Sequence, residues 1–156
     1  MEKATFAAGC FWGVQLDFDK LDGVSSTVVG YIGGHTENPT YEAICGGQTN
    51  HAEAVEVSFD PEKISFEYLL DIFWQLHNPT TLNQQGPDFG SQYRSAIFYH
   101  SGEQKLAAEA SREKCEASNL WPDPIVTEIV KASQFWKAED YHQKYLEKRN
   151  IKISCH

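Results

Sequence analysis

The sequence predicts an α+β fold, and three observations support this class. The chain has 156 residues, enough for one domain that buries its own core. Over residues 3–99, segments with strand-like or helix-like spacing of apolar residues follow the order strand, helix, strand, strand, helix, strand. Pairs such as Gly33-Gly34 and Asp60-Pro61 separate them. This order matches the split β-α-β core of ferredoxin-like folds, an antiparallel or mixed sheet covered by helices, and the later elements form a C-terminal extension.

The first strand is expected over residues 4–8. The helix after it is predicted from Val14, Phe18 and Leu21, which recur at i, i+4 and i+7. Residues 24–32 are rich in valine and threonine and predict the second strand.

Residues 35–50 predict an irregular loop, and loops of this length tend to be functional or disordered. The strand after it, over residues 52–59, alternates apolar and polar side chains, and the period of two places Glu53 on the apolar face. Burial there would raise the pKa of Glu53, so that it could donate a proton near neutral pH. The alternative is a glutamate at a strand end whose tip reaches solvent.

The rest of the chain continues the alternation of strands and helices. We predict, in order, a helix capped by Ser65 and ended by Asn78-Pro79, a polar loop over 80–92, a strand over 93–99, a helix over 103–117 opened by a capping box from Ser101 to Gln104, a strand over 125–130 and a short helix over 138–146. Together these elements define a single domain over residues 1–146, followed by a polar tail over residues 147–156.

The charge balance narrows the range of partners. Thirteen Lys and Arg residues against 22 Asp and Glu residues give a net charge of −9, and no basic run occurs. Nucleic acids and anionic membrane surfaces are therefore disfavoured as partners. No apolar stretch has the length of a signal peptide or a membrane span, so we expect a cytoplasmic protein, and we expect it to be a monomer.

The four cysteines, Cys10, Cys45, Cys115 and Cys155, are irregularly spaced and form no C-x-x-C pair. This spacing argues against a structural zinc site and against a secreted disulfide framework, so no metal site is predicted. In a reducing compartment such cysteines are catalytic, redox-active or simply buried.

Cys10 has the most distinctive surroundings of the four. It lies between Gly9 and Gly13, at a junction between a strand and a helix, beside Phe11 and Trp12. The first N–H groups of a helix lack intrahelical partners and carry the positive end of its dipole, which favours a nucleophilic thiolate. The alternative is a cysteine that packs as a small apolar residue.

Four sequence blocks closely resemble those of A-type peptide methionine sulfoxide reductases, in the same order along the chain. They are Gly9-Cys10-Phe11-Trp12, Asn38-Pro39-Thr40-Tyr41, His51-Ala52-Glu53-Ala54-Val55, and a long block from His77-Asn78-Pro79-Thr80-Thr81 through Asp88-Phe89-Gly90-Ser91-Gln92-Tyr93-Arg94-Ser95. The resemblance covers most of the chain. It implies thiol-based reduction of the S epimer of methionine sulfoxide, free or in proteins, with thioredoxin as the source of reducing equivalents.

The resemblance also implies a role for each matching residue. Cys10 would be the nucleophile, Glu53 the acid, and Cys155 in the tail would resolve the intermediate. The substrate's S-methyl group would lie against Phe11 and Trp12, and the polar network around the sulfoxide oxygen would consist of Tyr41, Tyr93 and Asp88. No organic cofactor is implied, because sulfur carries the electrons.

The chemistry requires these residue types independently of the family. An unprotonated oxide is a poor leaving group, so a neutral carboxylic acid has to protonate the sulfoxide oxygen, and phenolic O–H groups can donate to the polarised S–O bond. Because an ionised carboxylate only accepts hydrogen bonds, Glu53 has to be protonated for this role. The product, a sulfenic acid on Cys10, condenses with a second thiol to form a disulfide.

Two positions depart from the family pattern. Asn50 stands where a glycine usually precedes the His-Ala-Glu block, and asparagine tolerates positive φ better than most residues. The tail has no glycine beside Cys155, although it must fold back to bring this residue to Cys10. Cys45 is the second candidate for the resolving cysteine, and Cys115 is expected to be structural.

Other functions fit parts of the pattern. A thiol peroxidase would use an activated and a resolving cysteine without a protonated acid. A cysteine hydrolase would pair Cys10 with His35 or His51, although neither histidine has an orienting carboxylate by spacing. A non-enzymatic module would use the aromatic residues as a peptide groove, and a metal site built from Cys10, Cys45, His35 and His51 is the weakest interpretation.

Overall fold

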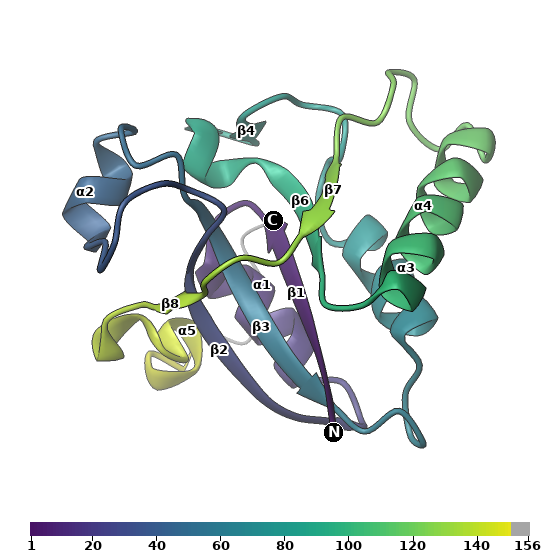
Figure 1. Ribbon diagram of the computed structural model, residues 1–156, viewed down its shortest axis with the longest axis horizontal. Coiled ribbons are helices and arrows are strands. Elements are labelled where there is room, and N and C mark those ends of the chain that lie inside the picture. The colour runs from purple at the N-terminus through teal and green to yellow at the C-terminus, as the bar shows by residue number, and fades with distance from the viewer. Residues whose placement is uncertain (151–156) are drawn as a thin grey trace.

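The computed structural model describes residues 1–150, which form a six-stranded sheet with the order β7-β6-β1-β3-β2-β8 (Figure 1). The strands are β1 (Glu2–Ala8), β2 (Val24–Ile32), β3 (Ala52–Phe59), β6 (Ser95–Tyr99), β7 (Glu128–Lys131) and β8 (Trp136–Lys137). The four central strands, β6-β1-β3-β2, pair antiparallel, β7 runs parallel to β6, and β8 runs antiparallel to β2. The predicted α+β class with a split β-α-β core is confirmed, and β2 and β3 have the predicted bounds.

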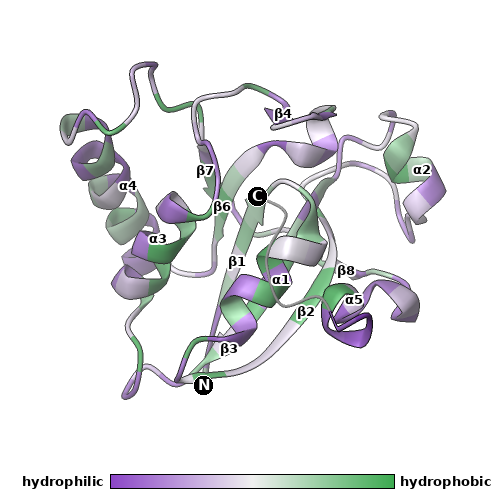
Figure 2. Cartoon of the chain, turned by 180° about the vertical axis from the view of Figure 1, so that it is seen from behind, coloured by the Kyte–Doolittle hydropathy of each residue, from purple (hydrophilic) through white to green (hydrophobic). Residues whose placement is uncertain are grey.

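The helices and short elements complete the chain. They are, in order, α1 (Phe11–Asp19), α2 (Tyr41–Cys45), α3 (Phe66–Gln75), the hairpin strands β4 (Gln84–Gln85) and β5 (Asp88–Phe89), a 3-10 turn (Ser91–Tyr93), α4 (Gly102–Ala117), a second 3-10 turn (Asp140–His142) and α5 (Tyr145–Lys148). Figure 2 shows α1 in front of the sheet when the molecule is seen from behind, and α4 packs beside α3. Within the described part of the chain, no helix is long and apolar enough to cross a bilayer.

The main core lies between the sheet and the helices α1 and α3. Phe6 of β1 is central to it, because its ring centroid lies 5.1 Å from that of Phe18 on α1 and 6.1 and 5.3 Å from those of Phe66 and Phe73 on α3. Phe6, Phe18 and Phe73 are fully buried. Both helices are therefore held against one face of the sheet by a single cluster of aromatic rings.

The opposite face of the sheet carries a smaller apolar cluster that the chain between β7 and β8 covers. Ile32 and Phe98 are buried in this cluster, and Ala132 and Phe135 pack against it. In Figure 1 this segment crosses in front of the sheet. Because both faces of the central strands are covered, β1 and β3 are buried almost continuously and not at every second residue.

The predicted helix caps are present, with one change. Ser65 caps α3 by accepting a hydrogen bond from the Tyr68 N–H at 3.1 Å. Ser101 caps α4 by accepting from the Gln104 N–H at 3.2 Å. In a capping box the Gln104 side chain would accept from the N–H of the N-cap residue, Ser101. Here it accepts instead from the N–H of His100, one residue earlier, at 2.9 Å.

Both predicted loops contain short elements that side-chain alternation does not reveal. The first holds α2, which Thr40 caps by accepting from the Ala43 N–H at 3.2 Å. The second holds the hairpin β4–β5 and the first 3-10 turn. The prediction of a strand from residue 93 was wrong, because the Tyr93 N–H donates to the Gly90 carbonyl at 3.0 Å and closes that turn before β6 begins at Ser95.

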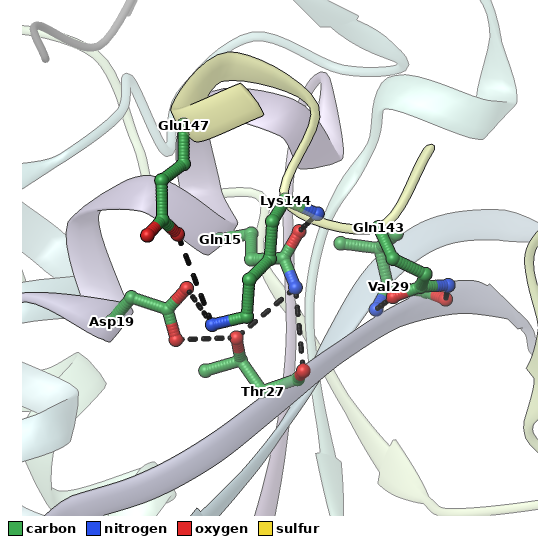
Figure 3. A network of polar contacts seen from close by, with 7 residues as sticks. All are labelled: Gln15, Asp19, Thr27, Val29, Gln143, Lys144 and Glu147. Carbon is green, nitrogen blue, oxygen red and sulfur yellow. Dashed lines mark hydrogen bonds and ion pairs between the residues drawn. The ribbon is translucent and has the colours of Figure 1, made fainter. Parts of the chain in front are cut away.

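The prediction of a helix over residues 138–146 was also wrong. Lys144 has a φ of 55°, in the left-handed region, and no α-helix continues through such a residue. Side-chain contacts fix this backbone: Gln143 bonds both backbone groups of Val29, and the Lys144 N–H donates to Gln15 Oε1 at 2.7 Å (Figure 3). The strand predicted from residue 125 begins instead at residue 128.

We expect Phe6→Ala to lower the free energy of unfolding by about 3–5 kcal/mol, because it leaves a cavity between the three other rings. Urea denaturation measures the change. Leu106→Ala on α4 is the control, since this side chain is 69% exposed and its loss should cost about 0.5 kcal/mol or less. A cost at Phe6 no larger than that of the control would contradict its central place in the core.

Candidate active site

Cys10 is placed by the turn that joins β1 to α1. β1 ends at Ala8, and Gly9 takes a φ of 94°, which only glycine adopts readily. Cys10 follows as the N-cap residue of α1, half-buried, with a φ of −55° and a ψ of 121°. The predicted position of Cys10 at a helix N-terminus is therefore confirmed.

Glu53 lies on β3 beside the start of α1. Its side chain is 1% exposed, and Oε1 accepts a hydrogen bond from the Phe11 N–H at 3.3 Å. Its second oxygen, Oε2, is also buried and has no hydrogen-bond partner within residues 1–150. The carboxyl group next to Cys10 therefore keeps one oxygen available.

Burial raises the pKa of Glu53 from 4.5 to about 8. Within this net shift the hydrogen bond from the Phe11 N–H acts in the opposite direction, and the negative charge of Asp88 is a smaller contribution in the same direction as burial. The group is therefore a neutral carboxylic acid at pH 7, as the alternation of β3 predicted.

A pocket of about 470 Å³ opens above Cys10. It is lined by side chains and backbone from the start of α1, from α2, from the β4–β5 hairpin and from the first 3-10 turn: Cys10, Trp12, Gly13, Tyr41, Gln85, Gly86, Pro87, Asp88 and Tyr93. A hollow of about 540 Å³ lies elsewhere, between the first turns of α3 and α4, and contains none of the predicted site residues. The cysteine and the convergent polar groups identify the smaller pocket as the candidate active site.

Tyr41 and Tyr93 reach this pocket from two separate segments. Burial is the main cause that raises the pKa of each hydroxyl, and the second is the charge that Glu53 carries at the high pH where a phenol would ionise. Both phenols therefore stay protonated and can donate hydrogen bonds into the pocket, and the Tyr41 hydroxyl also shares a hydrogen bond with the Cys45 side chain. Tyr41 is further fixed by its backbone N–H, which donates to Glu139 Oε2 at 3.0 Å.

The hairpin wall of the pocket is held by a side-chain amide. Gln85 Oε1 accepts from the Asn78 N–H at 3.0 Å, and Gln85 Nε2 donates to the Asn78 carbonyl at 2.8 Å. This pair replaces the two hydrogen bonds that a neighbouring strand would make. It fixes the loop that presents Asp88 to the pocket.

Phe11 and Trp12 have different environments, although both were predicted to bind substrate. Phe11 is fully buried, with its ring 5.8 Å from Tyr31 and 5.2 Å from His142, and it does not line the pocket. Trp12 does line the pocket. Its Nε1–H donates to His142 Nδ1 at 2.9 Å, and the Tyr145 ring stacks on it at 3.8 Å with an interplanar angle of 7°.

Three residues that sequence analysis missed support this site from the C-terminal segment: Glu139, His142 and Tyr145. Glu139 accepts from the Tyr31 hydroxyl at 2.8 Å as well as from the Tyr41 N–H, and these bonds lower its pKa against the effect of burial. His142 is fully buried. No sequence signal separates them, because the polar run from Glu139 to Tyr145 is equally typical of a solvent-facing helix.

The other cysteines lie in distinct surroundings. Cys45 is exposed at the end of α2, one turn after Tyr41, and Cys115 lies half-buried on α4, where burial raises the pKa of its thiol. Cys155 lies outside the described residues. Asn50 has a φ of 59°, so asparagine accommodates the turn at this position as predicted.

His51, one of the two histidines considered as a base for Cys10, has no free ring nitrogen. His51 Nδ1 accepts from the Gly34 N–H at 3.0 Å, and its Nε2 bonds the Thr36 carbonyl at 2.8 Å, so both ring nitrogens are already used. His35 is exposed. Among the described residues, no three His, Cys, Asp or Glu side chains gather around a point that could hold a metal ion.

A cysteine at the start of a helix, beside a carboxylic acid that burial keeps protonated, is the arrangement of a thiol-dependent oxidoreductase. Comparison with known families agrees, because the family model described as peptide methionine sulfoxide reductase matches residues 2–156. The chain therefore belongs to the peptide methionine sulfoxide reductase family.

Individual relatives support this membership over nearly the whole chain. The peptide methionine sulfoxide reductase MsrA of Methanothermobacter thermautotrophicus is 63% identical over 155 residues, which are 99% of this chain and 91% of the relative. Mxr1 from Saccharomyces cerevisiae in reduced form is similar in structure, with a TM-score of 0.92 and 36% identity over 99% of this chain and 88% of Mxr1. Mxr1 in complex with Trx2 has a TM-score of 0.66 and 27% identity over 92% of this chain and 84% of Mxr1.

We expect the Glu53 carboxyl to titrate with a midpoint of about 8. The pKa of Glu53 is higher in the folded chain than the value of 4.5 expected in the unfolded chain. The protonated group therefore contributes fully to the free energy of unfolding below pH 4.5, and this contribution is lost as the pH rises through about 8. Carbon-13 NMR of labelled glutamate carboxyls measures the midpoint, and Glu53→Gln identifies the signal and should remove this loss of stability. A midpoint near 4.5 for this signal would contradict the effect of burial.

Proposed function

We propose that this chain reduces the S epimer of methionine sulfoxide, free or in proteins, to methionine through Cys10, and that thioredoxin returns it to the reduced state. Membership of the family supports the reaction. The observation that carries the mechanism is the buried, protonated Glu53, which the Phe11 N–H holds beside Cys10 while its second oxygen stays unpartnered.

In the first step the Cys10 thiolate attacks the sulfoxide sulfur and forms an S–S bond, while Glu53 gives its proton to the sulfoxide oxygen, which leaves as hydroxide. Hydroxide then bonds to the Cys10 sulfur, the S–S bond breaks, and methionine departs, leaving a sulfenic acid on Cys10 and an ionised Glu53 that solvent reprotonates. The balance is one thiol plus one sulfoxide giving one sulfenic acid plus one thioether, so cysteine sulfur is oxidised by two electrons and methionine sulfur is reduced by two. Glu53 supplies what an oxide leaving group lacks, a proton at the moment of bond cleavage.

The other pocket residues orient the substrate in this proposal. Tyr41 and Tyr93 donate hydrogen bonds to the sulfoxide oxygen, as groups that are in place before reaction. Asp88 belongs to the same polar network, and its charge adds a smaller effect to the burial that raises the pKa of Glu53. Trp12 provides the apolar surface for the S-methyl group, and Phe11 contributes through its backbone N–H.

Resolution follows by condensation of the sulfenic acid with a second thiol, which forms a disulfide and releases water. We assign the second thiol to Cys155 and keep Cys45 as the other candidate, because it lies exposed one turn after Tyr41. Two thiols of thioredoxin then reduce the disulfide by exchange. The similarity to Mxr1, whose structure has been solved in complex with Trx2, supports this partner.

The proposal includes the setting of the reaction. The catalytic domain comprises residues 1–146, and the tail over residues 147–156 carries the resolving cysteine. We propose that the protein acts as a monomer in the cytoplasm. Sulfur carries the electrons throughout, so the reaction needs no organic cofactor.

We expect reduced protein to convert the S epimer of a methionine sulfoxide peptide in a single turnover and to leave the R epimer unchanged. Cys10→Ser should abolish conversion, and Glu53→Gln should slow it by about 100-fold or more, because it removes the general acid. The rate should fall as the pH rises through about 8, where Glu53 ionises. Chiral chromatography of quenched reactions measures both epimers, and failure to reduce either epimer would exclude the proposed reaction.

We expect Cys155→Ser to keep the single turnover and to lose steady-state turnover with thioredoxin, because its sulfenic acid has no resolving thiol. Cys45→Ser and Cys115→Ser are matched controls that should cycle normally. Consumption of NADPH in a coupled thioredoxin assay measures cycling. The opposite result, with cycling lost in Cys45→Ser and kept in Cys155→Ser, would transfer the resolving role to Cys45.

A further inference from the structure

The C-terminal segment is attached to the edge of the sheet through Gln143. Its Oε1 accepts from the Val29 N–H at 3.0 Å, and its Nε2 donates to the carbonyl groups of Val29 at 2.9 Å and Ala138 at 3.1 Å. One side-chain amide thus pairs with both backbone groups of a single residue on β2, as a further strand would (Figure 3).

A second glutamine holds the next residue from the side of α1. Gln15 is 1% exposed, and its Nε2 donates to the carbonyl and the hydroxyl of Thr27 at 3.3 and 3.1 Å. Its Oε1 accepts from the Lys144 N–H at 2.7 Å, while Lys144 Nζ pairs with Asp19 at 2.8 Å. We call Gln15 and Gln143 the glutamine clamp, since together they fix residues 143 and 144.

The residues on either side of the clamp both contact Trp12. His142 comes before it and accepts the hydrogen bond from the indole Nε1–H at 2.9 Å, and Tyr145 comes after it and stacks on the indole face at 3.8 Å. They can meet the same ring only because Lys144, with its φ of 55°, redirects the chain between the 3-10 turn and α5. Non-glycine residues adopt this conformation when surrounding contacts impose it, which the clamp does here.

We propose that Gln143 and Gln15 are positioning residues for substrate binding, which act by fixing His142 and Tyr145 against Trp12. The inference rests on the proposed function, because Trp12 is taken as the wall for the substrate's S-methyl group. Without the clamp the indole loses its fixed hydrogen-bond acceptor and its stacking partner, so the apolar wall loses its shape.

The clamp affects binding and chemistry differently. Cys10 and Glu53 are held by β1, β3 and the backbone N–H of Phe11, which make none of the clamp bonds. The clamp reaches this part of the site only through the His142 ring, which packs 5.2 Å from the Phe11 ring and 4.4 Å from the Tyr41 ring. Loss of the clamp therefore weakens substrate binding more than it slows the bond-breaking step. A general loss of stability would not separate the two in this way.

The test compares Gln143→Leu with Gln104→Leu in single-turnover reduction of the S epimer. Gln104 is a matched control at a distance from the pocket: it is 6% exposed, accepts from the His100 N–H at 2.9 Å and donates to the Lys3 carbonyl at 2.8 Å. We expect Gln143→Leu to raise the substrate concentration at half-maximal rate by about tenfold, with the maximal rate changed by about twofold or less. Gln104→Leu should change neither, although both variants lose stability to urea.

Two further measurements show whether Gln143 acts through Trp12. In a double-mutant cycle, the effect of Gln143→Leu on half-saturation should largely disappear in a Trp12→Phe background, because phenylalanine has no N–H to place. The indole N–H resonance of Trp12 should shift in Gln143→Leu and stay in place in Gln104→Leu. If Gln143→Leu does not fold, Gln143→Glu replaces it, since a carboxylate keeps the acceptor for the Val29 N–H and loses both donated bonds.

The outcomes separate this inference from the proposed function. Absence of reduction in the wild-type protein contradicts the function itself. If the wild-type protein is active, two results overturn the positioning role alone. One is an equal substrate concentration at half-maximal rate in the Gln143 and Gln104 variants, and the other is full additivity of the two substitutions in the double-mutant cycle.

Discussion

The hydrogen bond from the Phe11 N–H to the buried Glu53 is the contact on which the site depends. It joins β3 to the first turn of α1 and places a carboxyl group next to Cys10. An ionised carboxylate at this depth would cost several kcal/mol, so the group keeps its proton. Since β3 pairs directly with β1, the order of strands in the sheet brings these two segments together, and the acid follows from the topology.

The walls of the pocket belong to segments without long regular elements, and glutamine side chains hold them. Gln85 pairs with the backbone of Asn78 behind the hairpin, and Gln143 pairs with the backbone of Val29 behind the C-terminal segment. Each amide bonds the N–H and the C=O of one residue, and the Val29 C=O also accepts from the Ala138 N–H at 3.0 Å. Short loops thereby gain the fixed geometry of a strand at the cost of ordering one side chain.

Local patterns predicted the parts of the site that depend on regular structure. The period of two placed Glu53 correctly, and the junction of strand and helix placed Cys10, because both signals come from neighbouring residues. Lys144 could not be predicted, since partners more than a hundred residues away impose its conformation. Nor could the sequence separate Phe11 from Trp12: a rotation of about 100° per residue turns one ring into the core and leaves the other at the pocket.

The contacts along β2 also bear on self-association. An edge strand with free N–H and C=O groups is a template on which another chain can add a strand and start aggregation. Here β8 pairs with Gly30 and Tyr31, Gln143 occupies both groups of Val29, and Gln15 takes the carbonyl of Thr27. The outer edge of β2 is thus closed from Thr27 to Tyr31 by the chain itself. The segment that shapes the pocket therefore also protects this edge of the sheet from pairing with a second molecule.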